Sequence, residues 1–216
     1  MTTAFLTHPD CLDHVMPDGH PEQVARLAAV EAALRDHPGL LRREAPLASR
    51  EDVLRCHPAA HLDAITRAIP AAGHVALDPD THLAPGSLRA ALRGVGGACA
   101  AVDLVLAGEA TNAFVACRPP GHHAETARAM GFCLFGAVAI AARRALDHHG
   151  LQRVAIVDFD VHHGNGTQDL LWDEPRVLFA SSHQMPLYPG SGAPQERGAH
   201  GQIVNLPLAA GSDGAS

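Results

Sequence analysis

Short apolar runs alternate along the chain with longer stretches in which apolar residues recur at helical spacing. Runs rich in β-branched and other apolar residues predict strands at residues 3–7, 112–117, 153–159, 177–181 and 203–206. The stretches between them predict helices at residues 21–36, 51–55, 59–69, 87–107, 132–149 and 165–172. The middle three strands are almost continuously apolar, which is typical of strands covered on both faces. This alternation predicts a parallel α/β sheet with helices on both faces and right-handed crossovers.

Polar, histidine-rich segments follow three consecutive predicted strands. They occupy residues 118–125, 160–166 and 182–190. In open parallel sheets, ligands bind beyond the carboxyl ends of the strands. We therefore look for the functional site in these three loops.

The second of these strands ends in acidic and imidazole groups at alternate positions. Asp158, Asp160 and His162 should project to one side, because side chains on a strand alternate between its faces. A carboxylate and an imidazole two residues apart suit Zn²⁺ or a similar divalent ion, and the deeper Asp158 would orient another imidazole. In the alternative interpretation, a buried aspartate caps the next helix and the histidine has no role.

The first loop carries two adjacent histidines, His122 and His123, after a stiff Pro-Pro segment and Gly121. Two neighbouring imidazoles cannot both be buried without hydrogen-bond partners. A solvated loop pair is the alternative; beside a metal site, the pair suits general acid and base catalysis on a metal-bound water. Asp158 and Asn165 are the candidate orienting partners.

Two aromatic residues are candidates for the walls of a narrow channel. Gly131 and Phe132 stand where we expect a helix to begin, and Phe132 could line an apolar channel or pack in the core. Tyr188, the single tyrosine, lies in a predicted turn and could form the facing wall.

Composition narrows the class of protein. The 216 residues are 47% hydrophobic and 18% charged, which suits one α/β domain over residues 1–216. The net charge of −7 leaves no basic stripe for nucleic acid. No apolar run approaches the ~18 residues of a membrane span, so we expect no membrane association. Five cysteines without a Cys-x-x-Cys pair indicate a reducing compartment, the cytoplasm.

Four motifs together resemble the histone deacetylase superfamily. They are Arg118-Pro-Pro-Gly-His-His-Ala-Glu125, Gly131-Phe-Cys-Leu-Phe135, Val157-Asp-Phe-Asp-Val-His-His-Gly-Asn-Gly-Thr-Gln168 and Tyr188-Pro-Gly-Ser-Gly192. The sequence is most similar to the class II-like bacterial branch, which includes acetylpolyamine amidohydrolases. The resemblance implies an arginase–deacetylase type of parallel α/β fold.

The resemblance also implies roles for the matching positions. Asp160 and His162 match two of three protein ligands of a catalytic zinc, and His122 and His123 match the paired catalytic histidines. Asp158 and Asn165 match the residues that orient them. Gly131, Phe132 and Tyr188 match the substrate channel. Main-chain oxygens around Asp158, Asp160 and His162, with the Ser181 side chain, match a structural K⁺ site. The implied reaction is zinc-dependent hydrolysis of an acetylated amine, acetyl-lysine in proteins or an acetylpolyamine, to acetate and free amine.

The sequence departs from the family pattern after residues 203–208. The family's third zinc ligand is an aspartate in a later loop, and its carbonyl-polarising tyrosine lies in a later Gly-Gly-Tyr segment; Asp213 stands in a different context. We therefore expect a domain without the family's C-terminal strands and helices, whose last strand offers an exposed edge to a second copy or another partner.

Three functions remain open at this stage. The chain is a zinc deacetylase, a catalytically impaired family fragment, or a non-catalytic module that binds acetylated amines through Phe132 and Tyr188. A two-manganese, arginase-like enzyme shares the fold class, but the Asp-x-His-His-Gly order at residues 160–164 disfavours it.

Overall fold

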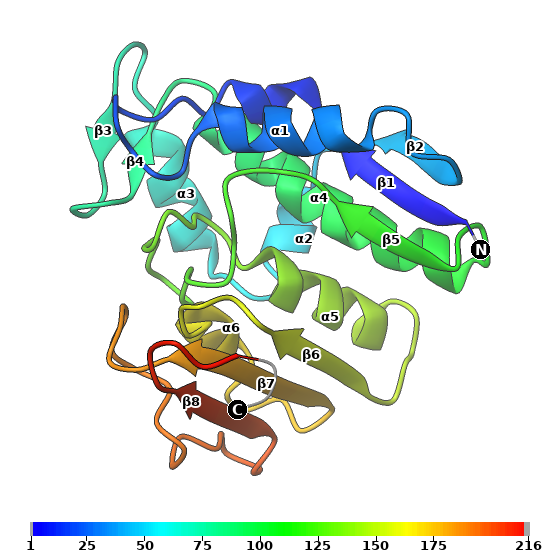
Figure 1. Cartoon of the computed structure of the whole chain (residues 1–216), viewed down its shortest axis with the longest axis vertical. Coiled ribbons are helices and arrows are strands. Elements are labelled where there is room, and N and C mark those ends of the chain that lie inside the picture. The colour runs from blue at the N-terminus through cyan, green and yellow to red at the C-terminus, as the bar shows by residue number, and fades with distance from the viewer. Residues whose placement is uncertain (1, 214–216) are drawn as a thin grey trace.

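The strands form two parallel groups of three. The computed structural model describes residues 2–213. The first sheet has the order β2-β1-β5 and the second the order β6-β7-β8 (Figure 1). Their bounds are β1 Thr3–Thr7, β2 Leu40–Glu44, β5 Asn112–Val115, β6 Val154–Asp158, β7 Val177–Gln184 and β8 Ile203–Leu208; β3 Val75–Ala76 and β4 His82–Leu83 make a small antiparallel pair. The predicted parallel α/β architecture is confirmed, but its strands pair as two sheets and not as one.

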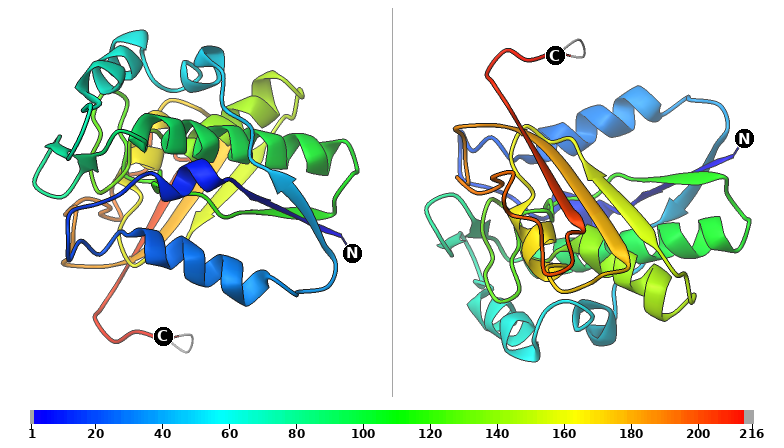
Figure 2. Two further views of the ribbon diagram at one scale, coloured as in Figure 1. Left: turned by 90° about the horizontal axis from the view of Figure 1, so that it is seen from above. Right: turned by 90° about the horizontal axis from the view of Figure 1, so that it is seen from below.

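Helices cover both faces of the first sheet. Their bounds are η1 Pro9–Leu12, α1 Val24–Leu34, α2 Arg50–Val53, α3 Ala59–Ala68, α4 Ser87–Leu106, α5 Ala137–Asp147 and α6 Asn165–Leu170. α1 lies on one face of β2-β1-β5 and α4 on the other (Figure 2, left). α4 approaches the chain after β2 closely, because a Cβ atom on Gly96 would stand 2.0 Å from the carbonyl oxygen of Pro46.

The second sheet is covered on one face only. α5 and α6 pack on the face that carries Val177, Phe179 and Ile203. The opposite face, which carries Leu178 and Val204, is exposed, and no helix stands in front of it in Figure 2, right. The prediction of helices on both faces is therefore wrong for β6-β7-β8. Apolar residues on both faces of these strands suggested full cover, but within residues 2–213 nothing packs on the outer face.

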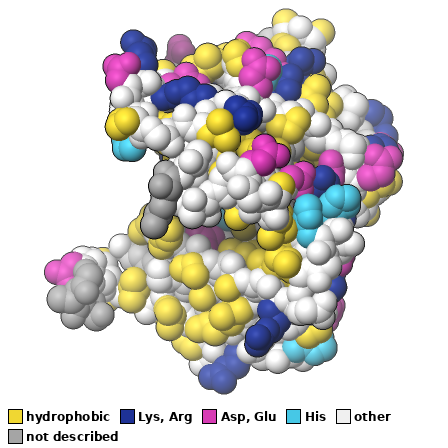
Figure 3. Space-filling view, turned by 90° about the vertical axis from the view of Figure 1, so that its right-hand side faces the viewer, with side chains coloured by type: hydrophobic (Ala, Val, Ile, Leu, Met, Phe, Trp, Pro, Cys, Tyr) yellow, Lys and Arg dark blue, Asp and Glu magenta, His cyan; other side chains and the backbone are white. Residues whose placement is uncertain are grey.

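A groove separates the two sheets. β5 and β6 are edge strands, and α4 packs against α5 behind them. Ala113 of β5 and Val154 of β6 line one hollow of about 380 Å³ between them. A second hollow of about 570 Å³ lies at the carboxyl end of β6. Figure 3 shows the molecule hollowed between its upper and lower parts, with hydrophobic side chains gathered over the lower part.

Most predicted elements match the structure within a few residues, but η1, β2 and the short β3–β4 pair were not predicted, and one helix begins later than predicted. The strand β2 was not predicted, because its Leu-Leu-Arg-Arg-Glu sequence lies at a largely exposed sheet edge. The helix predicted from residue 132 begins only at Ala137. Residues 131–136 form a loop because Phe132 has a φ of 69°, outside the helical range, and Met130 and Cys133 bond to each other through their backbones.

The buried His57 fixes this loop. Its Nδ1–H donates to the carbonyl oxygen of Thr126 at 3.1 Å, and its Nε2 accepts the N–H of Gly136 at 2.9 Å. The second bond requires a neutral ring, because a protonated Nε2 could no longer accept. Burial accordingly lowers the pKa of His57 to about 4, against partly opposing hydrogen bonds from the loop.

Acid is therefore expected to destabilise the protein. The unfolded chain takes up a proton on His57 below about pH 6.5, and the folded chain only near pH 4, so stability falls as the pH drops through this window. One such group contributes a slope of up to about 1.4 kcal/mol per pH unit. Urea unfolding at pH 7, 6 and 5 should show a shallower fall for His57→Asn than for the wild type. The exposed His37→Asn should keep the wild-type slope; equal slopes for all three would contradict the assignment.

Candidate active site

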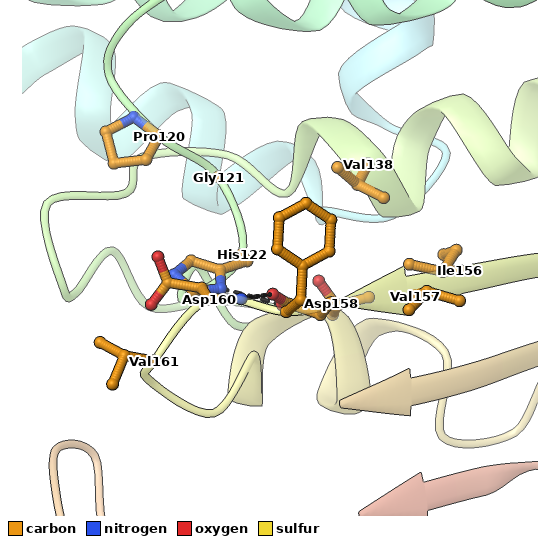
Figure 4. Close-up of a pocket in the computed structure, with 11 residues that line it drawn as sticks. Pro120, Gly121, His122, Val138, Ile156, Val157, Asp158, Asp160 and Val161 are labelled. Atoms are coloured by element: carbon orange, nitrogen blue, oxygen red, sulfur yellow. Dashed lines mark hydrogen bonds and ion pairs between the residues drawn. The ribbon is translucent and has the colours of Figure 1, made fainter. Parts of the chain in front are cut away.

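The predicted catalytic residues meet at the carboxyl ends of β5 and β6. The loop after β5 carries His122 and His123, and β6 ends at Asp158. Asp160 follows in the next loop, and the side chains of His122, Asp158 and Asp160 border the hollow at the end of β6 (Figure 4). The two sheets therefore each supply one half of the site, as the position of the polar loops predicted.

His122 is paired with a carboxylate. Its Nδ1–H donates to Asp158 Oδ2 at 2.9 Å, and the other oxygen of Asp158 accepts the backbone N–H of Asp160 at 3.1 Å. Burial alone would raise the pKa of Asp158, but the hydrogen bond and charge of His122, with the Asp160 amide, lower it below its ordinary value. Asp158 is therefore ionised at neutral pH and stabilises positive charge on the His122 ring.

His123 is paired with a neutral amide instead. Its Nδ1–H donates to Asn165 Oδ1 at 2.7 Å, and Asn165 Nδ2 donates to Glu125 Oε1 at 2.7 Å. Because Glu125 is an acceptor, it fixes which way the Asn165 amide points, and thereby which ring nitrogen of His123 carries the proton. Burial, helped by the neighbouring His122, lowers the pKa of His123 to about 4. His123 is neutral at pH 7, with Nε2 free to accept a proton.

The two rings lie side by side but have different electrostatic surroundings. Their centroids are 3.9 Å apart. One ring faces a carboxylate and the other an amide, so the pair can hold one proton without competing for it. This is the arrangement expected of a general base next to a general acid.

Gly131 lies against His123. A Cβ atom at this position would stand 2.4 Å from Cδ2 of the His123 ring, and the φ of +55° also favours glycine. Gly131 was predicted to begin a helix; that is wrong, since it lies in a loop, and its lack of a side chain makes room for the His123 ring. The next residue, Phe132, donates its N–H to Thr81 Oγ1 at 3.1 Å and meets the His20 ring at 4.8 Å.

Tyr188 borders the same histidine. Its ring lies 5.1 Å from that of His123, nearly perpendicular to it, and 6.2 Å from that of His162. Burial, reinforced by the charges of Asp80 and Asp78, raises the pKa of Tyr188 to about 12. A neutral aromatic side chain therefore lies beside His123 and His162, and its role as a channel wall stays a prediction.

A buried polar network anchors the loop that follows Tyr188. His163 Nδ1 and Ser191 Oγ are 2.8 Å apart, and His183 Nε2 donates to the carbonyl oxygen of Gly192 at 3.0 Å. The rings of His163 and His183 are in contact, with centroids 4.7 Å apart. No local sequence pattern indicated this network, because the partner of His163 lies 28 positions away along the chain.

Asp160 and His162 are adjacent at the surface of the site. Asp160 Oδ1 accepts the backbone N–H of His162 at 2.8 Å and lies 3.1 Å from its ring Nδ1. A carboxylate and an imidazole are donors that zinc prefers, but a catalytic zinc normally has three protein ligands and a water. Within residues 2–213, no three His, Cys, Asp or Glu side chains are grouped so as to hold a metal. The types of side chain fit zinc, but they provide two protein ligands where a catalytic zinc normally has three.

Ser181 lies next to this site inside the second sheet. It pairs with Asp158 in the β6–β7 ladder, is fully buried, and its Oγ is 3.1 Å from Nδ1 of His183. The side chain expected at a K⁺ site is thus beside the backbone of Asp158.

Several supporting residues were not predicted as such. Glu125, Thr81 and His57 act through contacts that span 40 to 79 positions of the chain. For none of the three does the local sequence pattern indicate the contact partner. Only their polarity next to motif residues could have indicated a role.

The chain matches a known protein family. The model of the histone deacetylase domain matches residues 20–216. An uncharacterized protein of Synechocystis is 42% identical over 98% of this chain and 71% of its own length. A probable deacetylase of Archaeoglobus fulgidus is 39% identical over 98% of this chain and 60% of its own length.

Two further proteins are similar to this chain. A histone deacetylase-like amidohydrolase of Pseudomonas aeruginosa is 47% identical over 78% of this chain and 45% of its own length. The crystal structure of the HDA15 HD domain superposes on 95% of this chain and 62% of its own, with a TM-score of 0.89 and 32% identity. The chain thus spans between about half and 71% of these curated relatives. No helix of residues 2–213 has the length and apolar character needed to cross a membrane. This chain belongs to the histone deacetylase domain family.

Proposed function

We propose that this site serves the zinc-dependent hydrolysis of N-acetyl amides of amines, releasing acetate and the free amine. The observation that carries the proposal is the histidine pair, in which one ring faces a carboxylate and the other an amide. Family membership supports a deacetylase or amidohydrolase. Asp160 and His162 would supply two ligands of the zinc.

The residues of the chain would divide the proton transfers between them. Neutral His123 accepts a proton from the attacking water at Nε2. His122, whose charge Asp158 stabilises, donates a proton from its own Nε2 to the amine nitrogen as the C–N bond breaks. Bound zinc supplies the Lewis acid for the carbonyl and the water. The two histidines together gain one proton from the water and lose one to the amine, so the number of protons that they hold is unchanged.

The substrate class follows from the entrance of the site. Tyr188 offers an aromatic surface beside His123, and Phe132 follows Gly131, which lies against the same ring; aromatic side chains here suit the apolar stem of acetyl-lysine or of an acetylpolyamine. The net charge of −7 favours a substrate with a positive charge elsewhere. We also propose a cytoplasmic location, in keeping with five free cysteines in the described chain, and a K⁺ ion near Ser181 and the backbone of Asp158, Asp160 and His162.

A second candidate function is a module that binds acetylated amines without hydrolysing them. The two-donor metal site favours it, because two protein ligands hold zinc weakly. In that case the aromatic side chains bind the ligand and His123 has no chemical role.

Zinc titration together with an acetate assay tests the proposal. We expect zinc to bind in a 1:1 ratio and Asp160→Ala to weaken it by at least about tenfold, or about 1.4 kcal/mol. Asp173→Ala, which removes an exposed carboxylate after α6, is the matched control and should bind zinc like the wild type. An acetyl-lysine peptide and an acetylpolyamine are then offered to the zinc-loaded protein.

The outcomes separate the candidates. Acetate release that depends on zinc supports the hydrolase. Binding of the peptide without acetate release, unchanged in His123→Ala, supports the binding module. Zinc binding that is identical in Asp160→Ala and the wild type contradicts the metal assignment.

A further inference from the structure

Two free cysteines lie at the carboxyl ends of neighbouring strands of the first sheet. Cys11 is fully buried in η1, which follows β1, and Cys117 follows β5. β1 and β5 pair in parallel, and the N–H of Ala116 extends the pairing by donating to the carbonyl oxygen of Leu6 at 2.8 Å. Both cysteines pack in one apolar cluster with Phe5. The fold therefore brings together two thiols that are far apart along the chain.

The two side chains are in direct contact. The Cys117 thiol and the backbone N–H of Arg118 both donate hydrogen bonds to the sulfur of Cys11. The Arg118 guanidinium also donates to the carbonyl oxygen of Cys11 at 3.0 Å. The Cys117 sulfur lies 3.9 Å from the carbonyl oxygen of Arg93 in α4. A bond between two sulfur atoms that already touch requires little movement of the backbone.

The two thiols differ in reactivity. The hydrogen bond from Cys117, with that from Arg118, lowers the pKa of Cys11 to about 7 against the effect of burial. The same hydrogen bond, together with burial, raises the pKa of Cys117. Near neutral pH a thiolate therefore stands next to a thiol, so that one can attack an oxidant and the other can displace the product. Burial raises the pKa of Cys56 and of Cys99 to about 12, and these two remain thiols.

Access limits which oxidant can act on this pair. Cys117 is partly exposed and lines a hollow of about 170 Å³ between α1 and β5. A hollow of this size admits hydrogen peroxide, whereas the fully buried Cys11 is out of reach of another protein. The geometry therefore favours a small peroxide over a protein that exchanges disulfides.

We propose that Cys11 and Cys117 are a redox modification site, at which hydrogen peroxide converts the two thiols to a disulfide. The Cys11 thiolate attacks one oxygen of the peroxide; the O–O bond breaks and leaves a sulfenic acid on Cys11 and a hydroxide, which takes up a proton. The Cys117 sulfur then attacks the Cys11 sulfur, the S–O bond breaks, and the oxygen leaves as water with the Cys117 proton. Two thiols thus lose two electrons to one peroxide, which becomes two waters.

The disulfide would tie η1 to the start of the loop that carries His122 and His123. Cross-linking two distant positions restricts the unfolded chain, and the restriction grows with the length of chain between them. The oxidised protein is therefore more stable than the reduced protein. The proposal concerns the first sheet and does not depend on the proposed activity.

Treatment of the full chain with hydrogen peroxide at pH 7 tests this. Intact-mass measurement should show a monomer that has lost two hydrogen atoms, and non-reducing digestion should give the Cys11 peptide linked to the Cys117 peptide. The thermal unfolding temperature should rise by at least about 4 °C and return when dithiothreitol reduces the bond. Sulfoxide at the partly exposed Met185 reports that the peroxide has acted.

Three variants assign the bond to this pair. Cys11→Ser and Cys117→Ser should each abolish the linked peptide and the rise in unfolding temperature. Cys99→Ser replaces a buried cysteine of α4 and is the matched control, in which both effects should remain. Each variant is compared with its own reduced form, so a change in its basal stability does not affect the result. The linked peptide of the wild type requires no variant at all.

Each other outcome overturns the proposal. Free thiols at Cys11 and Cys117 after Met185 is oxidised show that the pair does not react with peroxide. A bond between Cys56 and Cys99, or between two copies of the chain, places the oxidation elsewhere. A linked peptide without a higher unfolding temperature contradicts the stabilising effect. Because every readout is a mass or an unfolding temperature, an inactive deacetylase site would not affect them.

Discussion

Replacing His123 with alanine is expected to lower kcat/KM for deacetylation by about 10²–10⁴-fold, the usual contribution of a positioned acid or base. The physical reason is the chain of hydrogen bonds from Glu125 through Asn165 to His123 Nδ1, which leaves Nε2 as the proton acceptor. No other described ring has both this burial and this partner. The measurement is steady-state acetate release from an acetyl-lysine peptide with zinc present.

The matched control for this variant is His148→Ala, which removes an exposed histidine at the end of α5. It should leave kcat/KM within about twofold of the wild type. A loss of less than tenfold in His123→Ala, beside a complete loss in His122→Ala, would mean that His122 is the base and the roles are reversed.

Replacing Glu22 with alanine is expected to lower the free energy of unfolding by about 3–5 kcal/mol, because it leaves the buried Arg118 guanidinium without its counter-charge. Glu22 is 1% exposed and Arg118 4%. Arg118 donates to both carboxylate oxygens of Glu22 and to the carbonyl oxygens of Cys11 and His14. The pair therefore joins the loop after β5 to the segment before α1. Urea unfolding at pH 7 measures the effect.

Arg26→Ala is the matched control for this pair. Arg26 also contacts Glu22, at 3.7 Å, but its side chain is 64% exposed. An exposed ion pair contributes about 0–1 kcal/mol, so this variant should be nearly as stable as the wild type. Equal effects of the two variants would show that burial does not set the strength of the Glu22–Arg118 pair.

The sequence predicted those parts of the fold that local pattern determines. β1, β6 and β8 are apolar runs, and α4 is a long Ala-rich stretch, so their periodicity is visible without tertiary contacts. β2 was missed because Arg42 and Arg43 place charge in a strand that needs no buried face at the sheet edge. The start of α5 was misplaced because Phe132 looks like a helix residue, whereas its positive φ and its contacts with Thr81 and His20 place it in a loop.

The sequence allowed more to be expected about the position of the candidate site than about the details of the fold. The spacing of Asp158, Asp160 and His162 and the paired histidines were sufficient to locate it at two strand ends. Glu125 could not be assigned from sequence, since its role depends on which way the Asn165 amide points. The uncovered face of β6-β7-β8 was also beyond prediction, because a strand's own residues show that it needs cover but do not show what supplies it.

One hydrogen bond of the site links the two sheets to each other. The hydrogen bond from His122 to Asp158 is 2.9 Å long and joins a loop of the first sheet to the end of β6 in the second. Within residues 2–213 these two sheets share no strand pairing, and the packing of α4 against α5 joins them behind the site. A displacement of one sheet relative to the other would stretch this bond without breaking any strand pair. The length of this hydrogen bond thus reports how the two sheets are placed relative to each other.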